Sequence, residues 1–449
     1  MKNHLDKFIK KMKLAGLNDT VINSFSYYYD LVLKGESGKV SKNEIQVPNK
    51  KNIAIYNDLD ETKEVKPKDL VVIKLNGGLG TSMGLNKAKS LLPVKDDMTF
   101  LDIIANQIIY LRKETDTNLP VLFMNSFNTQ KDTLDFLKKY DSLALKKFGL
   151  DFLQNKFPKI VQNDLSPLET EDDKKSWNPP GHGEIYSALS TSGILDKLIE
   201  KGYKYAFISN SDNLGAVYDD KIYSYVINSE IPFLMEVCIR TEMDKKGGHL
   251  AETKIGQLML REVAQCPDDE IDEFQDVSKY KYFNTNTIWV NLEMLKKKLD
   301  ENNNFLPLPL ILNKKNVDNI DVFQLESAMG AAIQIFENSK AVVVPRSRFL
   351  PVKKTNDLLT IWSDLFKLNS DYRLTKTTDT PLPTIELDAK YYQKIDDFSK
   401  HFSKGIPSLK ECQSLKIEGN VSFGENVKIV GNIHIKSEDK KFIENEIIR

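Results

Sequence analysis

The sequence predicts an α/β fold followed by a short C-terminal repeat. Strand-like and helix-like patterns alternate from residue 70 to about residue 370, as they do along α/β sheets. The first predicted strand, Leu70 to Leu75, is mostly apolar and runs directly into a glycine-rich loop. Beyond residue 410, apolar residues recur every six positions, which is typical of a short parallel β-helix.

The region before the sheet is expected to be helical. Over residues 1 to 45, apolar residues such as Leu5, Phe8 and Met12 recur at helical spacing. A polar connector, Asn49 to Lys68, then leads into the first strand.

The alternation continues along the chain. Thr99 and Asp102 match a capping box at the start of one helix. Helices are expected at Phe100 to Thr115, Thr129 to Tyr140, Val322 to Phe336 and Asp357 to Leu368. Strands are expected at Leu119 to Asn125, Tyr203 to Ser209, Pro232 to Arg240, Ile255 to Val263, Tyr282 to Asn291 and Ala341 to Val344.

The C-terminal repeat consists of two interlocked apolar series, with glycine or asparagine between them. One coil of such a structure presents an apolar residue on each side, and an ordinary β-meander is the alternative. The end of so short a stack must be capped or must pair with another chain. The first series is Leu415, Val421, Val427 and Ile433, and the second is Ile417, Phe423, Ile429 and Ile435.

Composition narrows the class of protein. The 449 residues include 63 Lys and Arg against 64 Asp and Glu, and this balance argues against a general nucleic-acid binder. We expect no membrane span, since no uncharged run approaches the ~18 residues required. The N-terminus lacks a signal-peptide core, and the odd number of cysteines, Cys238, Cys266 and Cys412, suits reduced thiols. A cytoplasmic location is therefore expected.

The glycine-rich loop is predicted to bind phosphate groups. Glycines let main-chain N–H groups crowd around an anion, and Lys87 and Lys89 follow with positive charge. The loop contains no Walker A string, and Gly78, Gly80 and Gly84 are spaced one residue too widely for a dinucleotide fingerprint. A flexible turn without a ligand is the alternative.

Two further motifs suggest ligand contacts. The rigid turn Asn178 to Glu184 presents Gly181 and His182 on exposed backbone, although a stiff surface turn would look the same. Asp212 follows an apolar strand, where a carboxylate points into the ligand crevice of an α/β sheet. It is a candidate Mg²⁺ ligand, and a helix cap is the alternative.

Two weaker signals come later in the chain. Asn284 and Asn286 place amides suited to sugar hydroxyls beside apolar strand residues. The segment Pro345 to Lys354 concentrates four cations, which indicates either a phosphate partner or a solvated basic loop.

Together and in this order, the motifs resemble those of eukaryotic-type UTP–glucose-1-phosphate uridylyltransferase (UDP-glucose pyrophosphorylase). They are LNGGLGTSMGLNKAKS, FMNSFNT, PPGHGE, SNSDNLGA, KYFNTNTIW, QLESAMGAAI and VPRSRFLPVKK, and the resemblance covers roughly residues 20 to 440. It implies a Rossmann-like, glycosyltransferase-A-like mixed sheet with flanking helices and a C-terminal left-handed parallel β-helix. The implied domains are an N-terminal helical segment (1–66), a nucleotidyltransferase catalytic domain (67–370) and the β-helix domain (371–449).

The resemblance also implies residue roles. The UTP contacts are Leu75, Asn76, Gly77, Gly78, Lys89, Gln154, Gly181, Asp212 and Lys353. The sugar-phosphate contacts are His182, Asn210, Ser211, Asp212, Glu236 and Asn286. Gln154 is the implied uracil reader, Asp212 the Mg²⁺ ligand, and Lys89 and Lys353 the catalytic lysines.

The activity implied is Mg²⁺-dependent, reversible conversion of UTP and glucose 1-phosphate into UDP-glucose and pyrophosphate. Alternatives are another sugar, such as N-acetylglucosamine or galactose 1-phosphate, a non-catalytic sugar-nucleotide sensor, and a hexapeptide-repeat acyltransferase. No nucleic acid or membrane partner is expected. A homo-oligomer that forms through the β-helix is expected. Two features differ from many relatives: Ala88 replaces a common proline, and the sequence ends at Arg449, which leaves the oligomer open.

Overall fold

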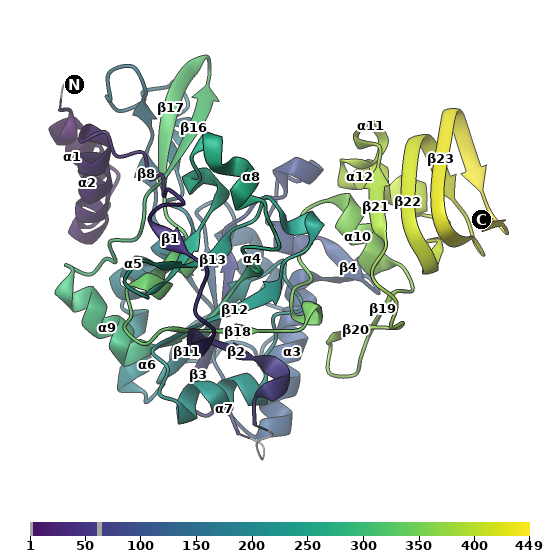
Figure 1. The fold of residues 1–449 in the computed structure, drawn as a ribbon, viewed down its shortest axis with the longest axis horizontal. Helices are drawn as coiled ribbons and strands as arrows, with labels where there is room; N and C mark the ends of the chain where they lie inside the picture. Colours follow the sequence, from purple (N-terminus) through teal and green to yellow (C-terminus); the bar gives the residue numbers. More distant parts are fainter. Residues whose placement is uncertain (1–2, 61–64) are drawn as a thin grey trace.

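A central mixed sheet organises the protein. The computed structural model describes residues 3–60 and 65–449, so residues 61–64 of the expected connector lie outside the described residues. In Figure 1 the sheet lies in the larger body, between the N-terminal helices and the yellow C-terminal strands. Its main path runs through β2 (Ile53–Ile55), β18 (Lys340–Val343), β12 (Phe233–Ile239), β15 (Tyr282–Asn291), β11 (Tyr205–Asn210), β3 (Leu70–Asn76), β6 (Val121–Asn125) and β7 (Asp151–Leu153).

Strand β15 is antiparallel to both of its neighbours on this path, β11 and β12. The pairs on either side of it are parallel, including β11 with β3 and β3 with β6. The carboxyl ends of β3, β6 and β11 therefore meet at one edge of the sheet, and Asn210 lies beside Leu75 there.

Helices cover both faces of the sheet, and the central strands are apolar on both sides as a result. On β3, Leu70 and Val72 belong to one core cluster, whereas Val71 and Ile73 belong to the other. The first face packs against α3 (Phe100–Thr115) and α7 (Asp220–Asn228). The second packs against α5 (Ile185–Thr191), α6 (Ile194–Glu200) and α9 (Leu292–Glu301).

Several predicted elements are confirmed. Helix α3 has the predicted bounds, and its capping box joins Asp102 N to Thr99 Oγ1 (3.1 Å) and Thr99 N to Asp102 Oδ2 (2.9 Å). The predicted helix at residues 129 to 140 is α4 (Gln130–Leu137). The N-terminal helical region is two helices, α1 (Leu5–Leu14) and α2 (Asp19–Leu33). Gly16, with φ of 74°, ends the first.

Two predicted helices are wrong in part. Residues 322 to 336 form the end of β17 (Ile320–Glu326) and then the short η10 (Met329–Gln334). Asp318 and Asn319 have positive φ and turn the chain back, so that β17 pairs with β16 (Ile311–Val317) in a hairpin. The other predicted helix ends early: α10 (Thr355–Trp362) is followed by β19 (Phe366–Leu368).

The physical reason is that periodicity fails in segments buried on all sides. Residues Met329, Gly330, Ala331, Ala332 and Ile333 of η10 are all buried, so their apolar run marks no single helical face. The strand predicted at residues 255 to 263 is likewise shorter, β14 (Leu258–Arg261), and its partner β13 (His249–Thr253) was missed.

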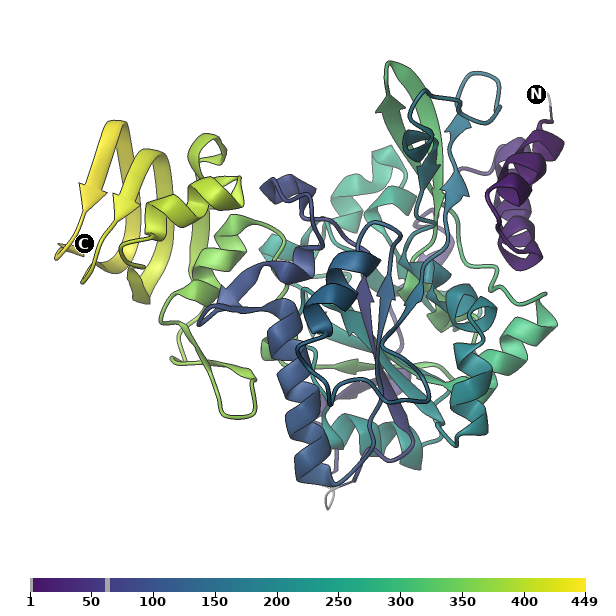
Figure 2. The ribbon, with the colours of Figure 1, turned by 180° about the vertical axis from the view of Figure 1, so that it is seen from behind.

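The C-terminal region consists of parallel strands: β21 (Thr384–Leu387), β22 (Ser408–Phe423), β23 (Lys428–Ile443) and β24 (Ile447–Ile448). Figure 2 shows the long strands curving around one another beside the central body. All eight residues of the two predicted apolar series are buried between them. A linear β-meander is excluded, because neighbouring strands there would run antiparallel.

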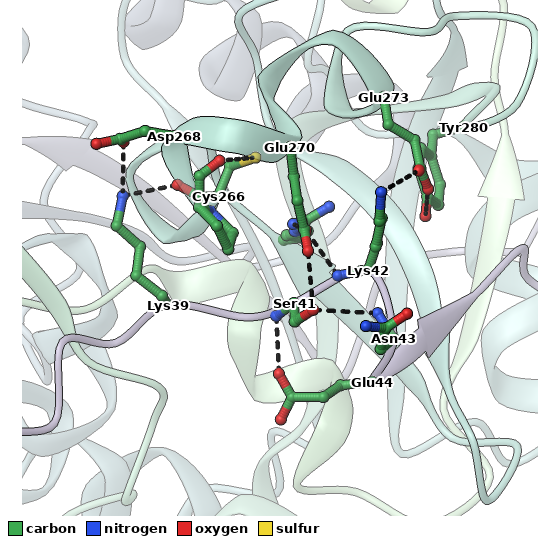
Figure 3. A network of polar contacts seen from close by, with 12 residues as sticks. Lys39, Ser41, Lys42, Asn43, Glu44, Cys266, Asp268, Glu270, Glu273 and Tyr280 are labelled. Atoms are coloured by element: carbon green, nitrogen blue, oxygen red, sulfur yellow. Dashed lines mark hydrogen bonds and ion pairs between the residues drawn. The ribbon is translucent and has the colours of Figure 1, made fainter.

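A segment near the N-terminus, residues 39 to 46, is tied to the edge of the sheet. Figure 3 shows Glu270 accepting hydrogen bonds from Ser41 Oγ (2.8 Å) and from the main-chain N of Lys42 (2.7 Å). Farther along, β1 (Ile45–Gln46) pairs with β13. Within the described residues, none of the helices is both long and apolar enough to cross a lipid bilayer.

Candidate active site

A cavity of about 280 Å³ opens where β3 and β11 end. Main-chain loops after these two strands form its floor, as expected at the carboxyl edge of an α/β sheet. It collects most of the site residues predicted from the sequence, although they come from four separate segments. Those lining it are Leu75, Asn76, Gly77, Gly78, Lys89, Gln154, Gly181, His182, Asn210, Ser211 and Asp212.

The glycine loop is held from beneath by buried side chains. Asn76 Nδ2 donates to Asn125 Oδ1 and Thr133 Oγ1, both at 2.8 Å. Its Oδ1 accepts from Ser211 Oγ (3.0 Å), whose main-chain N donates to Leu75 O (3.0 Å). The side chains of Asn76 and Ser211 are thus bonded inside the protein, and they position the loop main chain.

Two glycines of the site have different surroundings. Gly181 has φ of 80°, and a Cβ there would lie 2.4 Å from Ser327 O, so the fold itself excludes any other residue. A Cβ at Gly78 would meet no atom within 4 Å. The protein's own packing therefore does not require glycine at 78, and the free space on that side suits a ligand held close to the main chain.

Gln154 spans two walls of the cavity. Its main-chain N donates to Asn125 O (2.7 Å), and its side-chain Nε2 donates to Gly181 O (2.7 Å). Because Nε2 is held in this way, the orientation of the carboxamide is set, and Oε1 is the acceptor that the group can offer to a ligand.

His182 is a neutral hydrogen-bond donor. Its Nδ1 accepts from Met329 N (2.9 Å), so the ring proton of the neutral form sits on Nε2. Burial lowers the pKa of His182 to about 4, which keeps the ring uncharged at pH 7. The side chain lines the cavity and can donate one hydrogen bond there.

Lys89 and Asp212 form an ion pair across the cavity, with Nζ 2.5 Å from Oδ2. Both side chains are mostly buried but reach solvent. Over residues 3–60 and 65–449, no group of three or more His, Cys, Asp or Glu side chains could hold a metal ion. A single carboxylate nevertheless suits Mg²⁺ when substrate phosphates supply further oxygen ligands.

Lys353 lies outside this cavity. It lines a neighbouring groove of about 410 Å³, which also contains Arg346, and a smaller cavity beside Met83. Its segment is nevertheless tied to the Asp212 loop, because Val352 N donates to Asp212 O (3.1 Å). The segment carrying Lys353 is therefore adjacent to the cavity, although its side chain does not line it.

Asn213 strengthens this connection. Its Oδ1 accepts from Leu350 N (2.8 Å), and its Nδ2 donates to Arg348 O (3.2 Å). The side chain is buried. Asn213 thus joins the loop after β11 to the segment that precedes Lys353, and the sequence reasoning did not single it out.

The structure places Glu236 in the core and away from the cavity. Its side chain is fully buried, and its two carboxylate oxygens accept from Arg348 Nε and Nη2, each at 2.7 Å. Trp289 Nε1 donates to the same carboxylate (2.9 Å). Arg348 thus occupies the carboxylate in this structure, and the glucose contact expected at Glu236 stays a prediction.

Asn286 does not line the cavity but contacts a residue that does. Its Nδ2 donates to Asn210 Oδ1 (2.8 Å), and its φ of 56° is left-handed. It therefore orients a residue that lines the cavity, while its own contact with a sugar stays a prediction.

The sequence reasoning also missed Glu262, which follows the end of β14. Burial raises the pKa of Glu262, while a hydrogen bond from Asn284 and the charge of Lys353 act in the opposite direction. Glu262 lines none of the three cavities described above, and its relation to the site is the charge of Lys353 nearby. Its position after a strand, the same criterion that selected Asp212, was the available signal.

Comparisons with known proteins agree with this geometry. A family model described as UTP--glucose-1-phosphate uridylyltransferase matches residues 22–430. A protein of that name from Musa acuminata is 40% identical over 457 residues, covering 97% of this chain and 96% of its own length. One from Encephalitozoon cuniculi is 41% identical over 451 residues, covering 97% and 89%.

Solved structures are also similar over the whole chain. A UDP-glucose phosphorylase from Trypanosoma brucei has a TM-score of 0.90 and 42% identity, covering 100% of this chain and 99% of that one. A variant of UDP-glucose pyrophosphorylase from Leishmania major, crystallised in complex with UDP-glucose, has a TM-score of 0.91 and 40% identity, covering 100% and 98%.

Proposed function

Since the chain belongs to the UTP–glucose-1-phosphate uridylyltransferase family, we propose that the cavity joins UTP to glucose 1-phosphate, giving UDP-glucose and pyrophosphate. The observation that carries this proposal is the meeting of the glycine loop, Gln154, His182 and the Lys89–Asp212 pair in one cavity. This set offers main-chain donors, a base-reading amide and charges of both signs to a nucleotide.

Binding of UTP follows from these groups. The free space beside Gly78, where a Cβ would meet no atom within 4 Å, would receive the nucleoside, with Oε1 of Gln154 accepting from the N3–H of uracil. His182 would donate from Nε2 to an oxygen of the nucleotide or the sugar phosphate. Asn210, oriented by Asn286, lies on the side assigned to the sugar phosphate.

The reaction is a displacement at the α-phosphorus of UTP. A phosphate oxygen of glucose 1-phosphate forms the new P–O bond, and the bond to the departing pyrophosphate breaks. The attacking oxygen is already ionised, so no general base is required, and the barrier is the approach of two anions. Catalysis then consists of positioning and charge stabilisation by Lys89 and Lys353.

Asp212 is the residue that would hold Mg²⁺, together with phosphate oxygens. The bound ion would supply positive charge that lowers repulsion between the substrates. Because Lys89 pairs with Asp212 in the structure, we propose that Lys89 turns from this carboxylate to the phosphates when substrates bind.

We also propose a division into three parts: an N-terminal segment (1–66), a catalytic domain (67–370) and a left-handed β-helix (371–449). Leu415 pairs with Ile433 and Ile417 with Ile435, a spacing of 18 residues, or three repeats of six. This spacing supports a three-sided coil. An exposed end of this coil would suit pairing with a second copy in a homo-oligomer. Separately, the three buried, unpaired cysteines support a cytoplasmic location.

The proposed function is tested by measuring pyrophosphate release. The purified protein is incubated with Mg²⁺, UTP and, separately, glucose, galactose and N-acetylglucosamine 1-phosphates. We expect turnover with glucose 1-phosphate and weaker turnover with the other two sugar phosphates. Faster turnover of another sugar 1-phosphate would make that compound the substrate in place of glucose 1-phosphate. Binding without turnover would favour the sugar-nucleotide sensor.

A further inference from the structure

Two short segments that line the cavity side by side, around Gln154 and Gly181, are joined by a pair of polar links. One is the link from Gln154 Nε2 to Gly181 O described above. The other joins Asn155, the next residue of the first segment, to Glu184, three residues beyond Gly181. Glu184 Oε1 accepts from Asn155 Nδ2 (2.5 Å), and Glu184 Oε2 accepts from the main-chain N of Asn155 (3.1 Å).

Glu184 is an unusual residue to find at this point. Its side chain is only 6% exposed. Among the described residues, none of the ion pairs includes Glu184. A buried carboxyl group without a cation is costly, and burial accordingly raises the pKa of Glu184 to about 8. Its polar contacts are both with Asn155, and Glu184 does not line the cavity itself.

We propose that Glu184 is a positioning residue for recognition of the base, acting through Asn155 on the carboxamide of Gln154. The inference rests on the proposed function, in which Gln154 reads uracil. Glu184 holds the Asn155 peptide N–H and side chain together, and the peptide bond between Gln154 and Asn155 is thereby fixed relative to Gly181.

The consequence for specificity follows from the chemistry of the bases. With Nε2 held by Gly181 O, Gln154 presents Oε1, an acceptor, to the ligand. Uracil has an N–H donor at N3, whereas cytosine has an acceptor there, so a fixed Oε1 favours uracil and opposes cytosine. If the segment loosens, the carboxamide can rotate and present its NH₂ group, and discrimination against cytosine falls.

The experiment compares Glu184→Ala and Glu184→Gln in the full-length protein. For each, KM and kcat are measured with UTP and CTP at saturating glucose 1-phosphate, and KM for glucose 1-phosphate is measured at saturating UTP. Glu184→Ala is expected to raise KM for UTP and to lower the ratio of kcat/KM for UTP over CTP, each about tenfold, the effect of roughly one hydrogen bond. We expect kcat and KM for glucose 1-phosphate to change less than threefold.

Glu184→Gln provides the rescue. A carboxamide can still accept from the Asn155 main-chain N–H, and a flipped Asn155 side chain can accept from the new NH₂ group, so selectivity for UTP should stay near wild type. A merely structural role of the carboxyl group would not separate base selectivity from kcat in this way.

Asn155→Ala removes the side-chain bond of this link, keeps the bond from the main-chain N at position 155, and serves if Glu184→Ala does not fold. It should lower selectivity for UTP over CTP in the same direction as Glu184→Ala but by a smaller factor. Unchanged selectivity in the folded variants, or an equal loss with both nucleotides, would overturn the role of Glu184. Absence of turnover by the wild-type protein would instead overturn the proposed function, so the two failures are distinguishable.

Discussion

The two halves of the proposed site are held in different ways. The nucleotide half, formed by the loops after β3 and β11, follows from main-chain pairing, in which Asn210 lies beside Leu75. The half that contains Lys353 depends on side chains far apart in the sequence, with Arg348 buried against Glu236 and Asn213 bonded to Leu350. The first half is a property of the sheet, and the second is a property of the packed core.

This difference affects how each half should respond to substitution. In the nucleotide half, Lys89 and Asp212 line the cavity and reach solvent, so their removal should reduce turnover with little loss of stability. In the other half, the pair of Glu236 and Arg348 is buried at a distance from the cavity, so its loss should reduce stability first. The following predictions test this contrast.

The largest effect is expected from Asp212→Ala. The substitution removes the carboxylate proposed to hold Mg²⁺ and leaves Lys89 without its partner, so turnover should fall at least about 10³-fold. The measurement is pyrophosphate release at saturating substrates and Mg²⁺. Asp135→Ala removes an exposed carboxylate of α4 and should leave turnover unchanged. Turnover of Asp212→Ala within tenfold of wild type would refute the role of Asp212.

Glu236→Ala tests the packed core. It leaves the guanidinium of Arg348 buried without its partner, and the free energy of unfolding should fall by about 3–5 kcal/mol, as measured by urea denaturation. The double variant Glu236→Met with Arg348→Met should recover most of that loss, because buried pairs can be replaced by apolar side chains.

The same double variant also tests the glucose contact first expected at Glu236. Its KM for glucose 1-phosphate should stay within a few-fold of wild type. A rise of more than tenfold in this KM, with stability unchanged, would place Glu236 in the sugar site after all and remove the contrast between the halves.

Lys353→Ala sharpens the comparison between the two halves. Lys353 is positioned by the packing of the second half, but its proposed role is to stabilise charge on the phosphates in the first. Loss of a cation that stabilises the transition state should lower kcat on the order of 10²–10³-fold, with the unfolding free energy nearly unchanged. Lys354→Ala, at the adjacent lysine, should lower kcat only a few-fold. Similar kcat values for the two variants would exclude Lys353 from the mechanism.

The last prediction concerns the dependence of stability on pH. The folded protein holds the Glu184 carboxyl group protonated up to a pKa of about 8, well above its ordinary value. Its contribution to stability is therefore complete below the ordinary pKa of 4.5 and is lost as pH rises through 8. His182, with a pKa lowered to about 4, has the opposite sign, and its contribution is lost as pH falls from 6.5 through 4.

Glu184→Gln isolates the first of these contributions. Relative to wild type, the variant should gain unfolding free energy as pH rises between 5 and 8, by at most about 1.4 kcal/mol per pH unit. Urea denaturation at several pH values measures this difference. Parallel pH profiles for the two proteins would mean that the Glu184 carboxyl group does not titrate between the folded and unfolded states.

Local patterns in the sequence were sufficient for the parts of the molecule that depend on neighbouring residues. The capping box at Thr99 and the glycine loop after Leu75 are examples, since each requires only a few consecutive residues. The six-residue period from Leu415 onward likewise predicted which side chains are buried in the C-terminal strands. The motifs that resemble the uridylyltransferase family were local too, and they led to the residues that line the cavity.

Only the tertiary structure decided the rest. Glu236 lies in the middle of β12 and Glu262 directly follows β14, and it is packing that buries one carboxylate against Arg348 and leaves the other near Lys353. Residues 322 to 326 are predicted as helix but form the end of a strand, because their two buried residues, Val322 and Leu325, are three positions apart, a spacing that also fits one face of a helix. A chain specifies its hydrogen-bonded loops through nearby residues, whereas the partner of a buried charge depends on which distant segments meet in the core.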